Sequence, residues 1–248
     1  MNIPKTYLTV GAMLVSFGIS SLAATTYNGN GNTSFGGPIG NGSLVLSDNG
    51  TTVSGTLNMA GAITGNAFVL YLQAAGVGFS STAGFNDNGD QLRTAISQYG
   101  GAGSQSILDF SSGFAPNYAI AIDPGNGVNF GGLWQLANGG ANSLPFVTGV
   151  NLSPTGTEGA GAYTFSFDLS SIGLTPGAGQ SFELFGMEVS ETGYSSAEAI
   201  GGSLTGSFGY GNTQTETSFS TYTAVPEPST LALAAGGLAV MVGLRRRK

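Results

Sequence analysis

The chain lacks the residues on which much protein chemistry depends. Its 248 residues include no cysteine and no histidine. Without them the chain can form no disulfide, and it can build no zinc site on thiolate or imidazole ligands. Nucleophilic catalysis through a Cys–His or Ser–His pair is excluded for the same reason. An enzyme here would have to work with carboxylates, Tyr, Ser, Thr or Arg93, so we expect a protein without catalytic activity.

Positive charge is scarce in the middle of the chain. Of the six basic residues, only Arg93 lies between residues 24 and 224, where twelve of the thirteen acidic residues lie. So acidic a surface repels phosphate backbones, which argues against nucleic acid as a partner. The balance is compatible with an extracellular domain or with binding of divalent cations.

The first 23 residues have the three parts of a signal peptide. Lys5 supplies the positive charge, residues 7–19 are apolar, and small residues precede Ala24. This pattern predicts export and cleavage between Ala23 and Ala24. The alternative is an uncleaved membrane anchor, but the apolar run is short for a span of about 20 residues.

The C-terminal segment, residues 225–248, also has three parts. It opens with the motif Val225, Pro226, Glu227, Pro228 and Ser229. An apolar run at 231–244 and a basic cluster at 245–248 follow, as in a stop-transfer segment whose positive end stays in the cytoplasm. We expect a hydrophobic transmembrane helix here, which anchors a precursor in the inner membrane; the alternative is an ordinary anchor that is never processed.

This tail resembles the PEP-CTERM sorting signal of Gram-negative bacteria. The resemblance implies recognition by an exosortase, a membrane-embedded transpeptidase or protease, with cleavage near the Pro-Glu-Pro motif. It also implies an association with exopolysaccharide and biofilm. The processed protein is then expected in the cell envelope or outside the cell.

Between the two ends, residues 24–224 alternate short apolar runs with turn clusters, which predicts an all-β domain. Strands are expected at 44–46, 51–57, 68–72, 118–122, 133–136, 163–169, 182–189 and 217–223. Strict alternation at 163–169 predicts one buried face, and Asn49-Gly50 predicts a hairpin with a type I′ turn. Eight to ten strands fit a single β-sandwich, jelly-roll-like in form. One short helix is expected after Asp90, its N-cap, with Leu92, Ala95 and Ile96 on one face.

Several phrases are similar to exported bacterial β-sandwiches of the family-9 carbohydrate-binding-module and DOMON-like type. They are GFNDNGDQLRTAIS, FSSGFAPNYAIAID, GGLWQLANGG, YTFSFDLSSIGL and ETGYSSAEAIGG. The resemblance implies a fold, and fold alone does not give function.

The best metal candidate is the turn around Asn86, Asn88 and Asp90. Calcium prefers six to eight oxygen ligands, which Asn and Asp at alternate positions can supply. The alternative is a polar turn that caps the following helix. A second turn rich in Asx residues, at 123–127, is a weaker candidate of the same kind.

Trp134, the only tryptophan, is the candidate ligand-binding residue. An exposed ring would stack on a sugar, with help from Tyr194 or Tyr210, whereas a buried ring would belong to the core. Carboxylates are numerous enough for a glycosidase pair, although nothing in their spacing is distinctive. They are Glu183, Glu188, Glu191, Asp109, Asp123, Asp168 and Glu198. We also expect Glu198 to cap a segment or to pair with Arg93.

Together these features predict an exported, non-catalytic binding or adhesion domain that is associated with exopolysaccharide. The alternatives are a structural matrix protein with no discrete ligand and a secreted glycan hydrolase that uses carboxylates.

Overall fold

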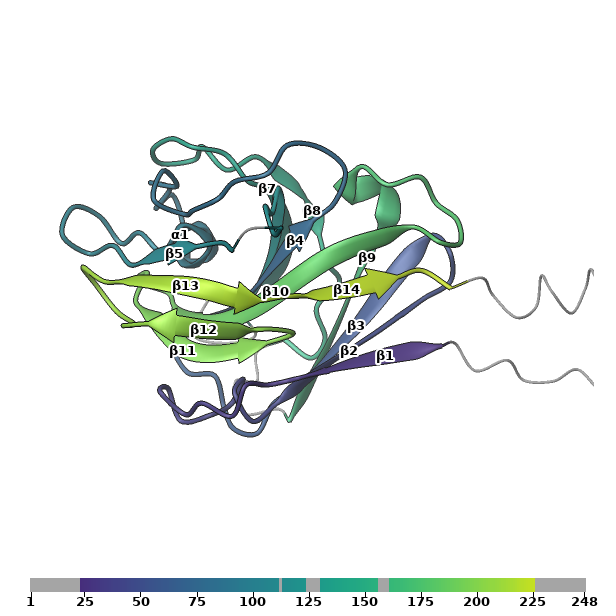
Figure 1. Cartoon of the computed structure of the whole chain (residues 1–248), viewed down its shortest axis with the longest axis horizontal. Helices are drawn as coiled ribbons and strands as arrows, with labels where there is room; N and C mark the ends of the chain where they lie inside the picture. Colours follow the sequence, from purple (N-terminus) through teal and green to yellow (C-terminus); the bar gives the residue numbers. More distant parts are fainter. Residues whose placement is uncertain (1–22, 112, 124–129, 156–160, 226–248) are drawn as a thin grey trace, which may run out of the picture.

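The computed structural model describes residues 23–111, 113–123, 130–155 and 161–225 (Figure 1). The predicted all-β sandwich with one short helix is confirmed: in these described ranges, fourteen strands accompany α1 (Gln91–Ser97) and a 3-10 turn, η1 (Leu169–Ile172). The strands in the first half are β1 (Ala24–Asn28), β2 (Ser43–Asp48), β3 (Thr52–Asn58), β4 (Asn66–Gln73), β5 (Ile107–Asp109), β6 (Tyr118–Asp123) and β7 (Phe130–Gln135). Those in the second half are β8 (Phe146–Gly149), β9 (Ala162–Asp168), β10 (Ser181–Ser190), β11 (Ser195–Ile200), β12 (Ser203–Gly206), β13 (Thr213–Ser218) and β14 (Ser220–Thr223).

Two sheets form the sandwich. One has the order β1-β2-β3-β9, and the larger has the order β11-β10-β4-β6-β7-β8, with β14 also paired to β10. A small third sheet joins β12, β13 and β5, and β5 runs parallel to β13. The larger sheet is therefore central, with the four-stranded sheet on one face.

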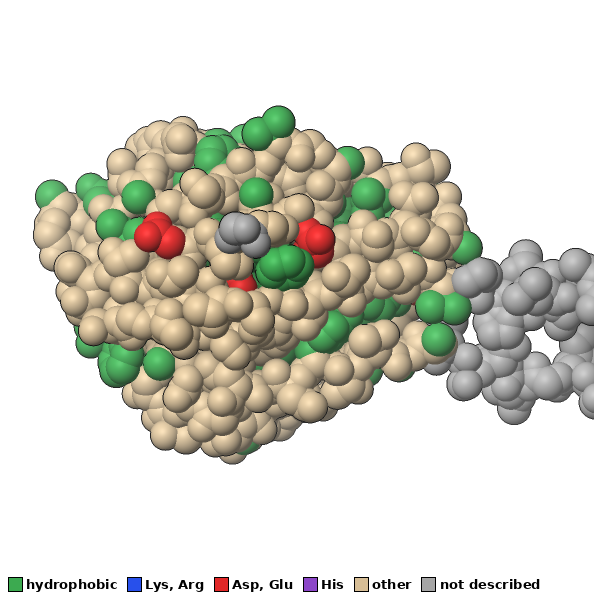
Figure 2. All heavy atoms as spheres, in the orientation of Figure 1, with side chains coloured by type: hydrophobic (Ala, Val, Ile, Leu, Met, Phe, Trp, Pro, Cys, Tyr) green, Lys and Arg blue, Asp and Glu red, His purple; other side chains and the backbone are tan. Residues whose placement is uncertain are grey.

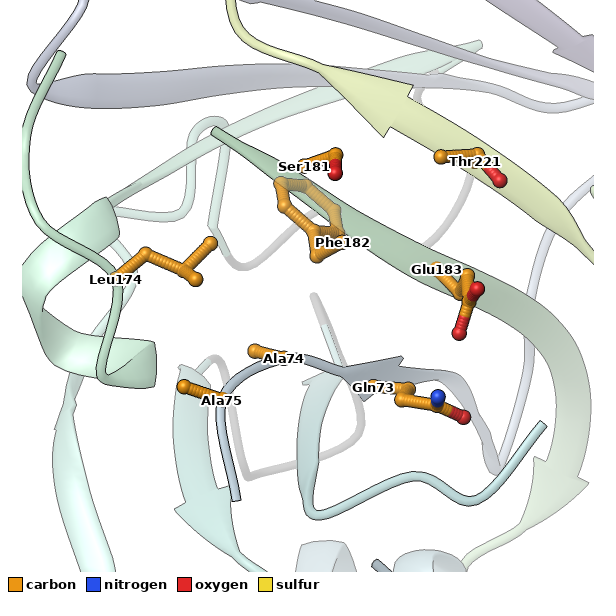
Figure 3. Close-up of a pocket in the computed structure, with 8 residues that line it drawn as sticks. All are labelled: Gln73, Ala74, Ala75, Leu174, Ser181, Phe182, Glu183 and Thr221. Atoms are coloured by element: carbon orange, nitrogen blue, oxygen red, sulfur yellow. The ribbon is translucent and has the colours of Figure 1, made fainter. Parts of the chain in front are cut away.

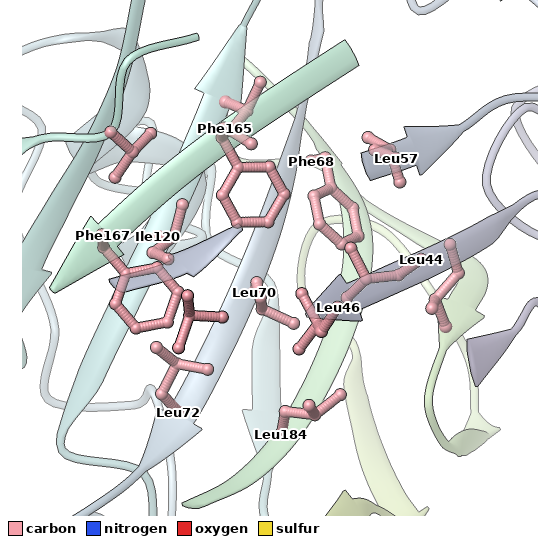
Figure 4. Packing of buried hydrophobic residues seen from close by; sticks show 14 of the residues in the cluster. Leu44, Leu46, Leu57, Phe68, Leu70, Leu72, Ile120, Phe165, Phe167 and Leu184 are labelled. Atoms are coloured by element: carbon pink, nitrogen blue, oxygen red, sulfur yellow. The ribbon is translucent and has the colours of Figure 1, made fainter. Parts of the chain in front are cut away.

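Strand β4 shows why its run of apolar residues is continuous. Phe68, Leu70 and Leu72 face the four-stranded sheet and pack with residues such as Leu46 and Phe165 (Figure 4). The alternate residues of β4 belong to a second apolar cluster on the opposite face. A strand that is buried on both faces has no polar side, so its sequence does not alternate.

The second face of the central sheet is covered by α1 and by loops. Leu92, Ala95 and Ile96 of α1 are buried against it, as expected, and α1 contacts β4, β6 and β10. Asp90 caps the helix by accepting a hydrogen bond from the N–H of Arg93 at 2.8 Å. The helix ends at Ser97, and its C-cap, Gln98, has a left-handed conformation (φ 54°). The predicted N-cap and apolar face of this helix are therefore confirmed.

Two local predictions were wrong. The β2–β3 hairpin forms, but in its turn only Gly50 has positive φ (81°), so the turn is not type I′. The side chain of Asn49 instead accepts from the N–H groups of Thr51 and Thr52. The expected single strand at 217–223 is two strands: β13 pairs with β12 and β5, whereas β14 pairs with β10.

The chain enters and leaves the fold at the same end of the molecule (Figure 1). β1 begins at Ala24, the first residue after the predicted cleavage point. After β14, Ala224 is buried and the N–H of Val225 donates to Asp48 at 3.1 Å. Asp48 also accepts from the hydroxyl of Tyr222 at 2.5 Å, so the chain stays bonded to the domain up to the first residue of the Pro-Glu-Pro segment.

Candidate functional site

An aromatic cavity lies beside the start of α1, over the edge of the central sheet. Its volume is about 340 Å³. It is lined by Asp90, Gln91, Leu92, Arg93, Phe130, Trp134 and Phe146. We call it the aromatic cavity below.

The register of β7 and β8 brings three aromatic rings to this cavity. Phe130 and Trp134 lie on the same face of β7, and Phe146 pairs directly with Trp134 across to β8. The ring centroids of Trp134 and Phe146 are 5.6 Å apart, and those of Phe130 and Phe146 are 6.1 Å apart. Gly132 lies between the two β7 aromatics, and a Cβ there would lie 2.6 Å from the Trp134 ring. Glycine at this position therefore lets the indole lie flat along the strand.

The exposed rings are the phenylalanines. Phe130 is 40% exposed and Phe146 is 48% exposed, whereas Trp134 is only 2% exposed. Of the two alternatives for Trp134, an exposed platform and a core ring, the structure shows the core ring, because the indole packs in the second apolar cluster. Tyr194 and Tyr210 do not join it. Tyr194 directly precedes β11, four strands away from β7 in the sheet order, and Tyr210, in the turn between β12 and β13, packs against Tyr194.

Arg93 is held at this cavity by acidic partners. Its guanidinium pairs with Asp90, and its Nε lies 3.6 Å from a carboxylate oxygen of Asp87. Its Cζ atom lies 5.9 Å from the centroid of the Trp134 ring, within range of a cation–π contact. The expected pairing of Arg93 with Glu198 is wrong, since both partners of Arg93 come from the turn before α1.

Residues of the predicted calcium turn line two different cavities. Asn86, Asn88 and Asp90 are all exposed, but Asp90 lines the aromatic cavity while Asn88 lines a different cavity. Within the described ranges, no cluster of three or more acidic side chains could hold a metal ion. As for the second turn, Asp123 is buried, and residues 124–127 lie outside the described part.

Asp87, which the sequence did not single out as a site residue, is the residue of this turn that orders the neighbouring loop. It is fully buried, and its carboxylate accepts from the N–H groups of Gly89, Asn142 and Leu144 at 2.7–2.9 Å. Asp87 thereby fastens the loop before β8 to the turn before α1. No signal in the sequence marks this role, because Asp87 stands between two other polar residues, Asn86 and Asn88.

A third cavity, of about 310 Å³, lies near the end where the termini leave the domain. Figure 3 shows the carboxylate of Glu183 near the amide of Gln73, with Leu174 and Phe182 farther along the cavity. Glu183 is the only carboxylate among the lining residues. A glycosidase needs two carboxylates across one cleft, and neither this cavity nor the aromatic cavity provides them.

The structure does bring Glu188 and Glu198 together, on the neighbouring strands β10 and β11. Both are fully buried, so no substrate reaches them in this structure. Burial, together with the neighbouring charge of Glu198 and a hydrogen bond with it, raises the pKa of Glu188 to about 9, against an opposing hydrogen bond from Asn66. Glu188 is therefore protonated at neutral pH and can share its proton with Glu198.

The carboxylate of Glu198 is surrounded by four backbone donors. One oxygen accepts from the N–H groups of Phe35 and Gly37 at 2.7 and 2.9 Å. The other accepts from Ile39 and Gly40 at 3.1 and 3.0 Å. Four donors around one carboxylate order the loop between β1 and β2.

The sorting signal is the part of the chain that comparison with known proteins identifies. A family model of the PEP-CTERM protein-sorting motif matches residues 224–248. No curated protein matches the chain. The protein therefore carries a PEP-CTERM sorting signal, which indicates a membrane-anchored precursor that an exosortase processes for export to the outside.

Of that signal, the structure describes only Ala224 and Val225. The rest of the predicted motif (Pro226, Glu227, Pro228 and Ser229), the apolar run and the basic cluster lie outside the described residues, as does the signal peptide up to residue 22. Within the described ranges no helix has the length and apolar character to cross a membrane. Ala23 and Ala24 are described and exposed, and cleavage between them stays a prediction.

Proposed function

We propose that the domain is a non-catalytic glycan-binding or adhesion module, which the sorting signal delivers to the exopolysaccharide around the cell. The observation that carries this proposal is the aromatic cavity. Two half-exposed phenylalanine rings there stand beside Asp90, Gln91 and Arg93. Sugars present apolar ring faces and a rim of hydroxyl groups, which match exposed aromatic rings and nearby polar side chains.

The geometry of these groups favours binding over chemistry. Phe130, Phe146 and Trp134 support one another, and Arg93 is fixed by two carboxylates, so ligand binding would order few side chains. The adjacent carboxylates Glu188 and Glu198 are buried in the interior, and Glu198 already orders a loop. The resemblance to carbohydrate-binding sandwiches points in the same direction.

The surface favours one second candidate, a structural matrix protein. Most of the face in Figure 2 is formed by uncharged polar groups and backbone, with few acidic side chains and scattered apolar ones. Such a surface suits a hydrated matrix without a discrete ligand. The two candidates differ in whether binding saturates at one site.

The experiment measures binding of the full-length protein, solubilised in mild detergent, to a panel of polysaccharides that includes the exopolysaccharide of its own bacterium. We expect saturable binding that Phe146→Ala weakens about tenfold, because the variant removes the most exposed ring. The control is Val77→Ala, which truncates an apolar residue that is 93% exposed and outside the aromatic cavity. Absence of saturable binding to every polysaccharide would refute the glycan-binding proposal and leave the matrix protein.

We further propose that calcium supports this binding through the oxygen-rich turn at 86–90. The same panel is therefore measured with calcium and then with EDTA. Loss of binding in EDTA that added calcium restores would support a calcium site. Equal binding in both conditions would remove calcium from the proposal without affecting the aromatic cavity.

A further inference from the structure

We infer that a second cavity, on the other side of the start of α1, binds the same ligand as the aromatic cavity, and that the ligand is a linear glycan held along its length. This inference rests on the proposed function and narrows the ligand class. A single sugar or a chain end would need one cavity, whereas an extended chain would contact both.

The second cavity has the chemistry of a sugar site. Its volume is about 370 Å³. Its lining includes Asn88, Ser104, Glu191, Thr192 and Tyr210, which offer an amide, two hydroxyl groups, a carboxylate and an aromatic ring. This combination of hydrogen-bond donors and acceptors beside one exposed ring fits a ligand that carries hydroxyl groups around an apolar face.

The ring of Tyr210 is held in place before any ligand arrives. It is 36% exposed, yet its hydroxyl lies 3.0 Å from the carbonyl oxygen of Thr192 and 2.7 Å from the Thr192 hydroxyl. The ring also packs edge-on against Tyr194, with centroids 5.0 Å apart. A ring fixed in this way loses little conformational entropy on binding.

The two cavities are joined by one hydrogen-bonded pair. Gln91 lines the aromatic cavity, and its side-chain amide donates to the carboxylate of Glu191, which lines the second cavity. Likewise Asp90 lines the first cavity and Asn88 the second. A chain that passes over the 88–91 turn would therefore move from one cavity to the other without crossing a separate domain or a long loop.

The sheet order sets the span of such a ligand. The aromatic cavity lies on β7 and β8, whereas Glu191 directly follows β10, three strands from β7. At the usual strand spacing this separation is roughly 15 Å. That span exceeds one sugar ring, so occupation of both cavities requires an oligosaccharide.

The test measures affinity against ligand length. It uses the full-length protein in mild detergent and size-graded fragments of whichever polysaccharide binds most tightly in the panel, down to the monosaccharide. We expect affinity to rise with length until both cavities are filled and then to level off. Phe146→Ala should weaken the binding of every fragment that the parent protein binds, whatever its length.

Variants of the second cavity supply the decisive comparison. Tyr210→Ala should weaken the longer fragments about tenfold while leaving the affinity of the shortest binders unchanged. Tyr210→Phe keeps the ring and should retain most of the affinity. Asn88→Ala changes an exposed side chain, so it tests the same cavity if Tyr210→Ala disturbs folding. Val77→Ala is again the control outside both cavities.

The outcomes separate the two proposals. If the polysaccharides bind through Phe146, but length has no effect and the Tyr210 and Asn88 variants bind like the parent protein, the linear-chain inference is wrong and the glycan-binding function stands. If no polysaccharide binds at all, both fail together.

Discussion

The middle of the sandwich and the end opposite to the chain termini, called the far end below, exclude water through different interactions. In the middle, side chains such as Leu46, Leu70 and Phe167 from the two sheets pack in one apolar cluster (Figure 4). At the far end, Glu188 and Glu198 lie side by side in the interior, and Glu198 holds the loop between β1 and β2 through four backbone N–H groups.

This difference shows two ways of excluding water. Apolar burial is non-directional and insensitive to pH, so it suits the regular middle, where strands supply their own backbone hydrogen bonds. The loop at the far end has backbone donors that no strand satisfies, and a buried carboxylate satisfies them at the cost of desolvating a charge. Changes of charge should therefore alter the stability of the far end, whereas they should not alter the stability of the middle.

The largest effect should come from Glu198→Gln. The variant keeps the shape of the side chain but sets an amide N–H₂ group against two of the four backbone donors. We expect a loss of about 4 kcal/mol in the free energy of unfolding, measured by urea denaturation. Glu183→Gln makes the same change on a less buried side chain beside Gln73, and it should cost under about 1 kcal/mol. Equal losses in the two variants would contradict the role of the four donors.

A somewhat smaller effect is expected from Leu70→Ala, in the middle of the sandwich. Truncation of this fully buried side chain should cost about 3 kcal/mol through lost burial and the cavity left behind. The loss should be the same at acidic and alkaline pH, because no group of the middle cluster near Leu70 changes its charge there. A loss that varied strongly with pH would show that the middle and the far end are not independent.

The smallest effect, and the one of opposite sign, should come from Glu188→Gln. The pKa of Glu188 rises from its ordinary value of 4.5 to about 9 in the folded protein. Between these values the unfolded chain releases the proton while the folded chain keeps it, so the wild-type protein loses stability as pH rises through this window.

Glutamine mimics the protonated acid and does not titrate. We therefore expect Glu188→Gln to match the wild type near pH 4 and to be more stable at pH 8. The full pKa shift would correspond to about 5 kcal/mol at pH 8, and relaxation of the site around the charge should reduce the gain to roughly 1–2 kcal/mol. Urea denaturation across the pH range gives the difference directly. Parallel stability curves for the two proteins would mean that Glu188 is ionised in the folded state.

The elements that sequence predicted best are those whose signals are local. The cap at Asp90 and the apolar face of α1 lie within a few residues of one another, and the alternation of β9 is visible in seven residues. The expected single strand at 217–223 was wrong because its two halves pair with different sheets, with Phe219 between them. Propensity gives no information about such a change of partner.

The candidate site depends on contacts that no local pattern reveals. Trp134 stands out in the sequence as the only tryptophan, but the exposed rings are Phe130 and Phe146, and Phe146 reaches Trp134 only through the β7–β8 register. Glu198 lies in a stretch of small residues, and its four donors come from residues 158–163 positions earlier in the chain. Their meeting follows from the whole topology, with close approaches that only glycine permits: a Cβ on Gly40 would lie 1.9 Å from the carbonyl oxygen of Asn32.

The direction in which the chain leaves the fold has a mechanical consequence. β14 runs along the longest axis of the molecule, and the sorting tail follows it directly (Figure 1). A pull between a tail fixed at the cell and a ligand held near the β10–β11 turn would act along this strand. Antiparallel hydrogen bonds lie across the strand direction, so the four residue pairs that join β14 to β10 would be loaded in shear and at the same time. Under such a load β14 separates from β10 only when all of these hydrogen bonds break together. A strand pulled away from its sheet at one end would instead lose them one after another.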